Sequence, residues 1–314
     1  MKGQLFMQQL KEFMENIQSQ ELNNCTSIFF SRKASSNGDT QYITHQPTVT
    51  NEVQKDILNT IFPYIESQLN SNVIVEYNAI GVLENEIEKI SSSEIPMFSK
   101  FIESIEPENL YRDIDSLKID KIGFYCIKVE WNSKVLYIFR QFQKLKKLRS
   151  GILTRIIDNT LNVIDNDFLG IDEYTDMIAF ENSLFLLNHI SLERIFNYRD
   201  EFLRKTNEAL EEILSKNILV NIEQFTDDCC SDIRIMKRFT NIMTKERLPL
   251  FFDNYDKVPE LVTDLGLDID FDEQGKLIYR ERSQLFHIVN LLSDSYFKSL
   301  LANRKGIAMI EGEV

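Results

Sequence analysis

Glycine, histidine and cysteine are scarce in this chain, and their scarcity excludes the common motifs of nucleotide and metal chemistry. Ten glycines, three histidines and four cysteines are scattered through 314 residues. No glycine-rich phosphate loop can form from them, and no histidine has a second histidine or a cysteine at metal-ligand spacing. The cysteine spacing matches neither a disulfide framework nor a zinc site, which favours the cytoplasm. We therefore expect no cofactor, no metal ion and no catalytic residue of these classes.

Long apolar runs and the signatures of hydrolases are also missing. No run approaches the roughly 18 apolar residues of a membrane span, and acids occur too early at the start of the chain for a signal peptide. The chain has no Gly-x-Ser-x-Gly and no acid-x-Lys pair of the kind that restriction-type nucleases need. The sequence therefore favours a cytoplasmic protein that acts by binding. A metal-dependent nuclease built from dispersed carboxylates is one alternative.

Hydrophobic periodicity predicts a sheet in the middle of the chain and helices towards its end. Apolar and polar residues alternate over 122–188, where three polar turns indicate an antiparallel meander of about six strands. After residue 191 the period changes to 3.6, which is typical of helices. The predicted helices cover 191–214, 231–246, 258–265 and 283–301. The predicted fold class is therefore α+β: an antiparallel β-meander sheet with flanking helices, followed by a mainly helical C-terminal half.

Prolines and glycines are too few for long linkers, so we expect two adjoining regions. The boundary is placed near residue 190. It separates a mixed α/β region over 1–190, centred on the sheet, from a mainly helical region with one hairpin over 191–314. The acidic stretch over 78–120 is predicted to form short helices broken by two prolines.

Positive charge is concentrated in one stretch of an acidic protein. The chain carries 35 Lys+Arg against 49 Asp+Glu, a formal net charge of −14. Residues 118–156 nevertheless hold ten basic and two acidic residues, so this stretch is +8 and the remainder is −22. An acidic protein that gathers positive charge in one place presents it to an anion. Nucleic acid is the first candidate, and the acidic face of another protein is the second.

The first of two basic clusters follows a predicted strand and contains no acid. Its cations are Arg140, Lys144, Lys146, Lys147 and Arg149. In a loop or short helix between two hairpins, each could neutralise one phosphate; the alternative is a solvated connection that keeps the protein soluble. The nearby Tyr137, Phe139 and Phe142 could stack on bases, although aromatic residues that alternate on a strand more often belong to a core.

The second basic cluster lies on the predicted helix over 231–246. At about 100° per residue, its cations fall on one face, opposite the apolar residues. These cations are Arg234, Lys237, Arg238 and Lys245. A charged outer face is usually only solvated, but such faces normally mix signs. If both clusters lie on one surface, they form a single groove for a phosphate backbone.

Five segments together carry a resemblance to a known family. They are residues 75–78, 134–140, 176–188, 192–198 and 265–279. In order and local sequence they resemble the B subunit of the Kiwa antiphage defence system. The resemblance implies a bacterial effector that binds phage DNA and blocks its replication or late transcription. It also implies a multi-pass membrane subunit as partner, which would recruit the protein to the inner face of the membrane. The resemblance transfers no functional residues.

The leading hypothesis is therefore a non-catalytic DNA-binding effector that uses the nine cations of the two clusters. There are two alternatives. One is the nuclease already mentioned, and the other is a protein-interaction module that docks on an acidic face of its partner. A homodimer is also predicted, because the last predicted helix could bury against a second copy; packing within its own chain is the other possibility. The apolar residues concerned are Leu291, Leu292, Tyr296, Leu300 and Leu301.

Overall fold

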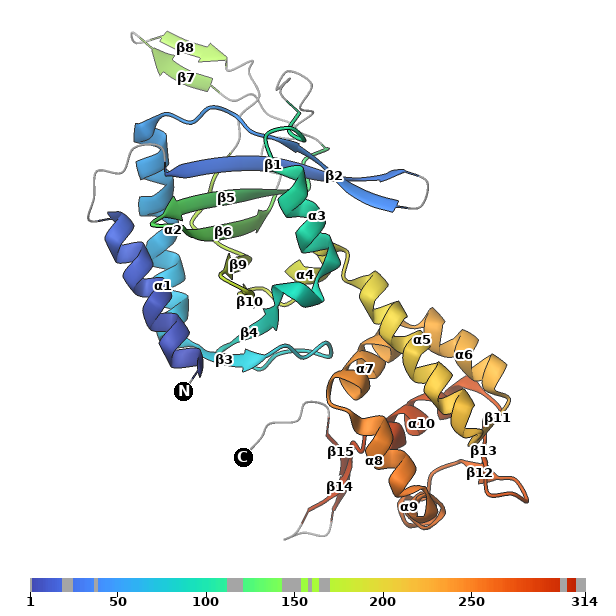
Figure 1. Ribbon diagram of the computed structural model, residues 1–314. Coiled ribbons are helices and arrows are strands. Elements are labelled where there is room, and N and C mark those ends of the chain that lie inside the picture. Colours follow the sequence, from blue (N-terminus) through green and yellow to red (C-terminus); the bar gives the residue numbers. More distant parts are fainter. Residues whose placement is uncertain are drawn as a thin grey trace. The chain divides into compact units, whose positions relative to one another are not determined.

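The computed structural model divides into two units (Figure 1). Each unit has a hydrophobic core of its own. The first unit consists of Met1–Tyr77 and Leu83–Asn197, and the second of Asn78–Val82 and Tyr198–Val314. The chain thus contributes a short segment to the second unit before it completes the first. The structure describes residues 2–18, 25–36, 39–111, 121–142, 154–157, 160–163, 170–299 and 304–308.

An eight-stranded sheet forms the centre of the first unit (Figure 1). Its strands are β1 (Thr26–Ser36), β2 (Asp39–His45), β3 (Val73–Glu76), β4 (Glu86–Ser91), β5 (Phe124–Trp131), β6 (Lys134–Gln141), β9 (Met177–Phe180) and β10 (Ser183–Leu186). Their spatial order is β2-β1-β5-β6-β9-β10-β4-β3. All neighbours pair antiparallel except β3 and β4, which are parallel. The predicted α+β class is therefore confirmed.

The meander differs from its prediction in two strands. Two of its three predicted hairpins, β5–β6 and β9–β10, lie side by side in the sheet. The hairpin between them, β7 (Thr154–Ile157) with β8 (Thr160–Val163), forms a separate two-stranded sheet. β6 pairs directly with β9 instead, and β4 pairs with the other edge of β10, although the sequence predicts helix over the residues of β4. The prediction was wrong because β4 buries the carboxylate of Glu88, so its apolar alternation is interrupted.

Helices cover both faces of this sheet. They are α1 (Lys2–Gln18), α2 (Asn51–Ser71), the 3-10 turn η1 (Ser92–Glu94), α3 (Pro96–Ser104) and α4 (Ser191–Phe196). α1 and α2 share one core with alternate residues of β5, such as Ile127 and Val129. Phe124, which lies on the opposite face of β5, packs instead against Phe101 of α3. This alternation is what a strand with two buried faces requires.

The second unit is mainly helical. Its helices are α5 (Arg199–Lys216), α6 (Ile222–Ser231), α7 (Ile233–Thr244), α8 (Arg247–Asp253), α9 (Val258–Leu265) and α10 (Leu285–Leu292), with 3-10 turns η5 (Tyr255–Lys257) and η6 (Arg282–Gln284). Its short strands are β11 (Leu219–Val220), β12 (Asp270–Phe271), β13 (Leu277–Ile278), β14 (Tyr296–Lys298) and β15 (Lys305–Ile307). α7 contacts four of the other helices, namely α5, α6, α8 and α10. These contacts determine which side chains of α7 face the core and which face away from it.

One predicted helix is divided in two, and another ends earlier than the sequence suggests. The helix predicted over 191–214 is divided into α4 and α5 at Asn197, which takes a left-handed conformation with φ of 51°. Asparagine adopts this conformation readily, so it can terminate a helix. The last predicted helix ends at Leu292, and the chain continues as β14.

The end of this last helix also bears on the predicted dimer. Leu291 and Leu292 are buried in the core of the second unit. They are therefore engaged within their own chain and offer no apolar face to a second copy. Tyr296 lies on β14, while Leu300 and Leu301 lie outside the described residues.

Candidate anion-binding site

The basic helix α7 forms as its pattern predicts. The carboxylate of Asp232 caps its N-terminus by accepting a hydrogen bond from the Arg234 amide at 2.9 Å. Ile235, Phe239 and Ile242 are buried in the core. The candidate cations consequently lie outside the core: Arg234 and Lys245 are exposed, while Lys237 and Arg238 are half-buried. The prediction that α7 has a buried apolar face is confirmed.

Arg234 shares one carboxylate with a second arginine. Its Nη2 lies 3.0 Å from Asp232 Oδ2, and Arg282 Nη2 lies 3.5 Å from the same oxygen. The side-chain hydrogen bond from Arg234 lowers the pKa of Asp232. Two guanidinium groups therefore lie around one carboxylate at this end of α7. Arg282 belongs to η6 and was not among the predicted site residues.

Aromatic rings and a neutral amide hold the two half-buried cations. Lys237 Nζ lies 5.5 Å from the centre of the Phe202 ring. The guanidinium of Arg238 lies 5.5 Å from the Phe286 ring, and its Nη1 donates to Asn290 Oδ1 at 2.8 Å. Within the described part of the chain, Arg238 has no carboxylate at ion-pair distance. Burial lowers its pKa, because the charged form is poorly solvated there.

A small pocket lies beside this half of α7, and Ile80, Ile242 and Ala308 form part of its lining. Three cations line it, Arg238, Lys245 and Arg247, together with the amides of Asn78 and Asn241 and the hydroxyl groups of Ser293 and Ser295. All of these residues belong to the second unit, and no carboxylate is among the lining residues. The pocket therefore brings three basic side chains and several neutral polar groups together.

Asn241 holds the part of the pocket wall that residues 78–80 contribute. Its Oδ1 accepts from the Ala79 amide at 3.0 Å, and its Nδ2 donates to Asn78 Oδ1 at 2.5 Å. The two amides are 163 residues apart in sequence, and no local pattern marks either as functional. The sequence did hold a signal for Arg247, which follows Lys245 by two residues in the same basic stretch.

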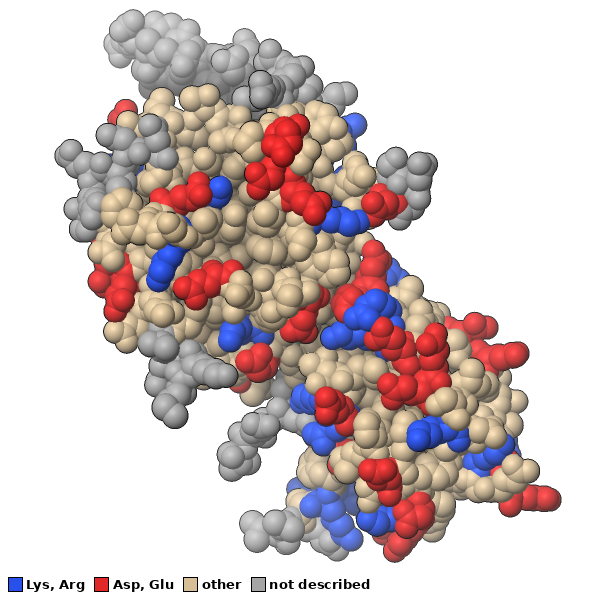
Figure 2. Space-filling view, in the orientation of Figure 1, with Lys and Arg blue, Asp and Glu red and all other residues tan. Residues whose placement is uncertain are grey.

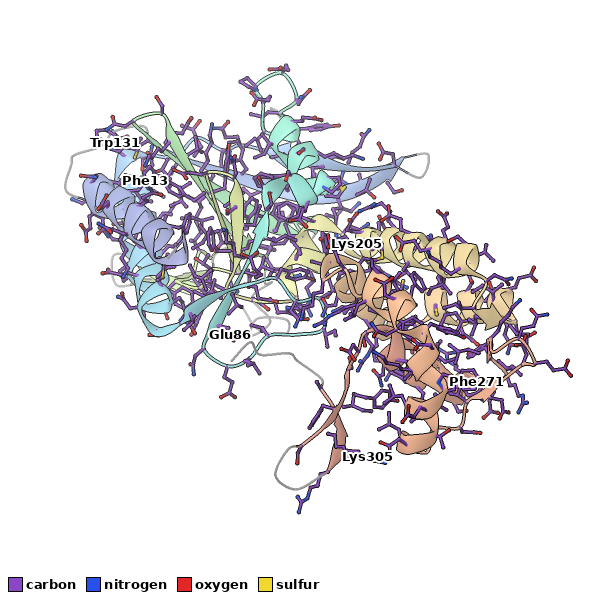
Figure 3. All side chains as sticks on the ribbon, turned by 60° about the horizontal axis from the view of Figure 1, so that its bottom comes forward. Phe13, Glu86, Trp131, Lys205, Phe271 and Lys305 are labelled. Atoms are coloured by element: carbon purple, nitrogen blue, oxygen red, sulfur yellow. The ribbon has the colours of Figure 1, made fainter. Side chains whose placement is uncertain are left out.

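A further cation lies near the C-terminal end of α7. Lys205 of α5, labelled in Figure 3, has its Nζ 3.2 Å from Thr244 Oγ1. Elsewhere on the face that Figure 2 shows, basic and acidic side chains are interspersed over the second unit.

The first basic cluster is divided by the structure. Arg140 lies on β6, and its guanidinium bridges Asp172 at 2.9 Å and Asp176 at 3.0 Å. Only 13% of the Arg140 side chain is exposed, so these carboxylates account for its position without an external anion. The other four cations, Lys144, Lys146, Lys147 and Arg149, lie outside the described residues. Arg140 belongs to the first unit and α7 to the second.

The aromatic residues beside this cluster are mostly engaged in packing. Phe139 is fully buried and stacks edge-on against Phe101 and Phe196. Tyr137 is half-buried and lies 6.2 Å from Phe98 between ring centres. Phe142 packs against the core of the first unit. These contacts favour a core role over base stacking.

The sequence did not predict the pairing of His189 with Glu88. His189 Nδ1 lies 2.6 Å from Glu88 Oε2, and the imidazole stacks on Tyr77 with ring centres 5.9 Å apart. Pairing of β10 with β4 brings these residues together. His189 Nε2 has no hydrogen-bond partner in the described structure, so the pair lacks the contact to a nucleophile that a catalytic triad has.

Comparison with protein-family models identifies the chain. The model described as "Kiwa protein KwaB-like" matches residues 119–302, which is more than half of the sequence. The chain belongs to the KwaB-like family. This membership indicates a component of the Kiwa antiphage defence system, and the KwaB-like range contains all nine predicted cations. Neither the search of curated proteins nor the search of solved structures found a match.

In the ranges that the structure describes, no helix is both long and apolar enough to cross a bilayer. The same ranges contain no group of three or more side chains arranged to hold a metal ion.

Proposed function

We propose that this KwaB-like protein binds DNA within Kiwa antiphage defence, and that the α7 surface of the second unit holds the phosphate backbone. The observation that carries the proposal is the accumulation of cations along one helix and at its C-cap, together with Arg282 of η6, which shares the carboxylate of Asp232 with Arg234. Lysine and arginine side chains bind DNA chiefly by neutralising phosphates and releasing counterions.

The proposed interface includes the cations of α7 and four of the first cluster. Its members are Arg234, Lys237, Arg238, Lys245, Lys144, Lys146, Lys147 and Arg149. Arg140 is left out, because its two carboxylate partners neutralise it. The KwaB-like resemblance further supports a cytoplasmic effector that blocks phage replication or late transcription. It also supports recruitment to the inner face of the membrane by a multi-pass subunit.

Binding that depends on about six to ten phosphate contacts should weaken steeply with salt. The logarithm of the association constant is expected to fall against the logarithm of salt concentration with a slope of about −5 to −9. Fluorescence anisotropy with labelled double-stranded and single-stranded DNA would measure it. Absence of binding at low salt would refute the proposal. Parallel incubation with Mg²⁺ or Mn²⁺ should leave the DNA intact; cleavage that chelation abolishes would show an enzyme instead.

Replacing Asp232 by asparagine is expected to tighten DNA binding. Asparagine caps helices about as well as aspartate, so α7 should keep its N-terminus while Arg234 and Arg282 lose their shared counter-charge. We expect the dissociation constant to fall by about fivefold at low salt, as for one charge removed a few ångströms from a phosphate.

A matched control is Glu260→Gln, which removes one exposed negative charge from α9 of the same unit. It changes the net charge equally but does not alter the surroundings of α7. Equal tightening in both variants would mean that net charge alone is acting and that the arginine pair at α7 has no special part.

A further inference from the structure

The two strands β14 and β15 form a ribbon that begins beside the cations of α7. Figures 1 and 3 show this β14–β15 ribbon extending from the helices of the second unit, and Figure 3 labels Lys305 on it. At its base the Ala308 amide donates to the Ser295 carbonyl at 2.8 Å. Both residues also line the small pocket that Arg238 of α7 lines. The ribbon is therefore adjacent to the proposed DNA-binding surface.

The pairing of the two strands determines which side chains share a face of the ribbon. The paired residues are Tyr296 with Ile307, Phe297 with Gly306, and Lys298 with Lys305. Successive residues of a strand point to opposite faces. The face of Tyr296 and Lys305 is tied to the helices, because the Tyr296 hydroxyl lies 2.8 Å from His287 Nδ1 and Lys305 Nζ lies 3.4 Å from Asp264 Oδ1. Phe297 therefore lies on the face that points away from them.

Phe297 presents an aromatic ring to solvent. It is 50% exposed, although phenylalanine is usually buried. The end of its ring lies over Gly306, where an added Cβ would be 2.6 Å from the ring Cζ. The φ angle of Gly306 is not positive, so the backbone does not require glycine there. The missing side chain instead leaves room for the ring, which rests against the partner strand and keeps its remaining surface open.

Positive charge surrounds this ring. Residues 295–308 contain Lys298, Arg304 and Lys305 and no acid. Lys305 has Asp264 as a counter-charge, but in the described ranges Lys298 and Arg304 have no carboxylate at ion-pair distance. A single exposed apolar residue is common on protein surfaces. An exposed ring between cations, on an acid-free ribbon, is instead the combination that binds single-stranded nucleic acid.

We propose that the β14–β15 ribbon binds single-stranded DNA, with an unpaired base stacked on Phe297 and its neighbouring phosphates held by Lys298 and Arg304. The inference rests on the proposed DNA-binding function and adds a strand preference to it. A base inside a duplex has both faces covered by its neighbours, whereas an unpaired base has a face available for the ring. Because every base has such a face, the contact should tolerate any sequence.

Replacing Phe297 by alanine should weaken binding to single-stranded DNA by about fivefold or more, as for the loss of one base–aromatic stack. Fluorescence anisotropy with one labelled oligonucleotide, alone and annealed to its complement, would measure it. The affinity for the duplex should not change. The salt dependence should also stay as in the wild type, because the substitution removes no charge. Phe297→Trp should keep the single-strand affinity, since tryptophan also stacks.

Two further variants connect the effect to the position of the ring. Gly306→Ala leaves Phe297 in place but puts a methyl group where the ring lies, so it should also weaken single-strand binding. Leu214→Ala is the matched control, because it removes another exposed apolar side chain of the second unit, from α5. It should bind both DNA forms as the wild type does. Circular dichroism would confirm that all variants are folded.

The two cations are tested by their effect on salt dependence. In Lys298→Gln/Arg304→Gln, the slope of log affinity against log salt for the single strand should become less negative by about 1.4, or about 0.7 for each lost phosphate contact. Lys216→Gln/Lys257→Gln removes the same charge from α5 and η5, and it should keep the wild-type slope. Equal changes in both variants would contradict phosphate contacts on the ribbon.

The outcomes separate this inference from the proposed function. If the wild-type protein binds neither the single strand nor the duplex, the proposed function fails and the ribbon inference fails with it. If it binds DNA and Phe297→Ala binds the single strand equally well, the ribbon inference alone is overturned. The same conclusion follows if Phe297→Ala weakens both DNA forms equally, or if Leu214→Ala weakens single-strand binding as much.

Discussion

Replacing Asp176 by alanine is expected to lower the free energy of unfolding of the first unit by about 3–5 kcal/mol, the usual effect of breaking a buried ion pair. The side chain of Asp176 is 3% exposed, and its oxygens accept from Arg140, from the Gln141 amide at 2.7 Å and from Asn188 Nδ2 at 3.0 Å. Without the carboxylate, two donors at the end of β6 and one after β10 lose an acceptor, and a largely buried guanidinium loses its closest buried counter-charge.

Tryptophan fluorescence can measure this loss of stability, and Asp172→Ala is the matched control. The single tryptophan, Trp131, lies at the end of β5 and is labelled in Figure 3, so its fluorescence reports unfolding of the first unit alone. Asp172→Ala removes the other carboxylate from the same arginine, but its side chain is 48% exposed. It should lower the unfolding free energy by only about 1 kcal/mol or less, as for a surface pair. Equal losses of unfolding free energy in the two variants would contradict the prediction that the buried carboxylate of Asp176 contributes more than the exposed one of Asp172.

The ion pairs of Arg140 change the interpretation of this residue. Its position at the start of a basic run favoured phosphate binding, yet both of its partners are acidic residues 32 and 36 positions away in sequence. A basic run can be recognised from sequence, but the carboxylates that fold back on one of its members cannot. The sequence period shows which face of an element is buried and says nothing about which distant residue will meet it.

Predictions that depend on local periodicity were the reliable ones. The alternation along β5 and β6 and the turn at Asn132 and Ser133, both with positive φ, follow from strand and hairpin geometry. The apolar face of α7 follows from helical geometry in the same way. Strand β4 was missed because it buries Glu88 against His189, an interaction that needs the whole sheet to be in place.

The residues that line the pocket beside α7 could also be predicted only in part from the sequence. Lys245 and Arg238 were predicted from the helical pattern, whereas Asn78 reaches them from the other half of the sequence. Nothing in residues 78–82 distinguishes them from a polar loop. Their role is set by the topology, because the chain enters the second unit there and pairs with Asn241.

Neutralising three cations of α7 should produce the largest change in DNA binding. In Lys237→Gln/Arg238→Gln/Lys245→Gln, the slope of log affinity against log salt should become less negative by about 2.7, or about 0.9 for each lost phosphate contact. The loss of affinity between about 50 and 200 mM salt would then be about 40-fold smaller than in the wild-type protein. Circular dichroism should confirm the helical content, since the second unit contains no tryptophan.

Two further triple variants make this result specific. Lys216→Gln/Lys257→Gln/Lys276→Gln removes equal charge from the same unit but away from α7, and its slope should stay near that of the wild type. Lys144→Gln/Lys146→Gln/Lys147→Gln tests the first cluster, and a similar change in slope there would add that cluster to the DNA interface. If the α7 variant and its control change the slope equally, the protein responds to net charge, and a defined surface on α7 is excluded. If the α7 variant keeps the wild-type slope but no longer co-purifies with a partner subunit, the cations bind an acidic protein face instead of DNA.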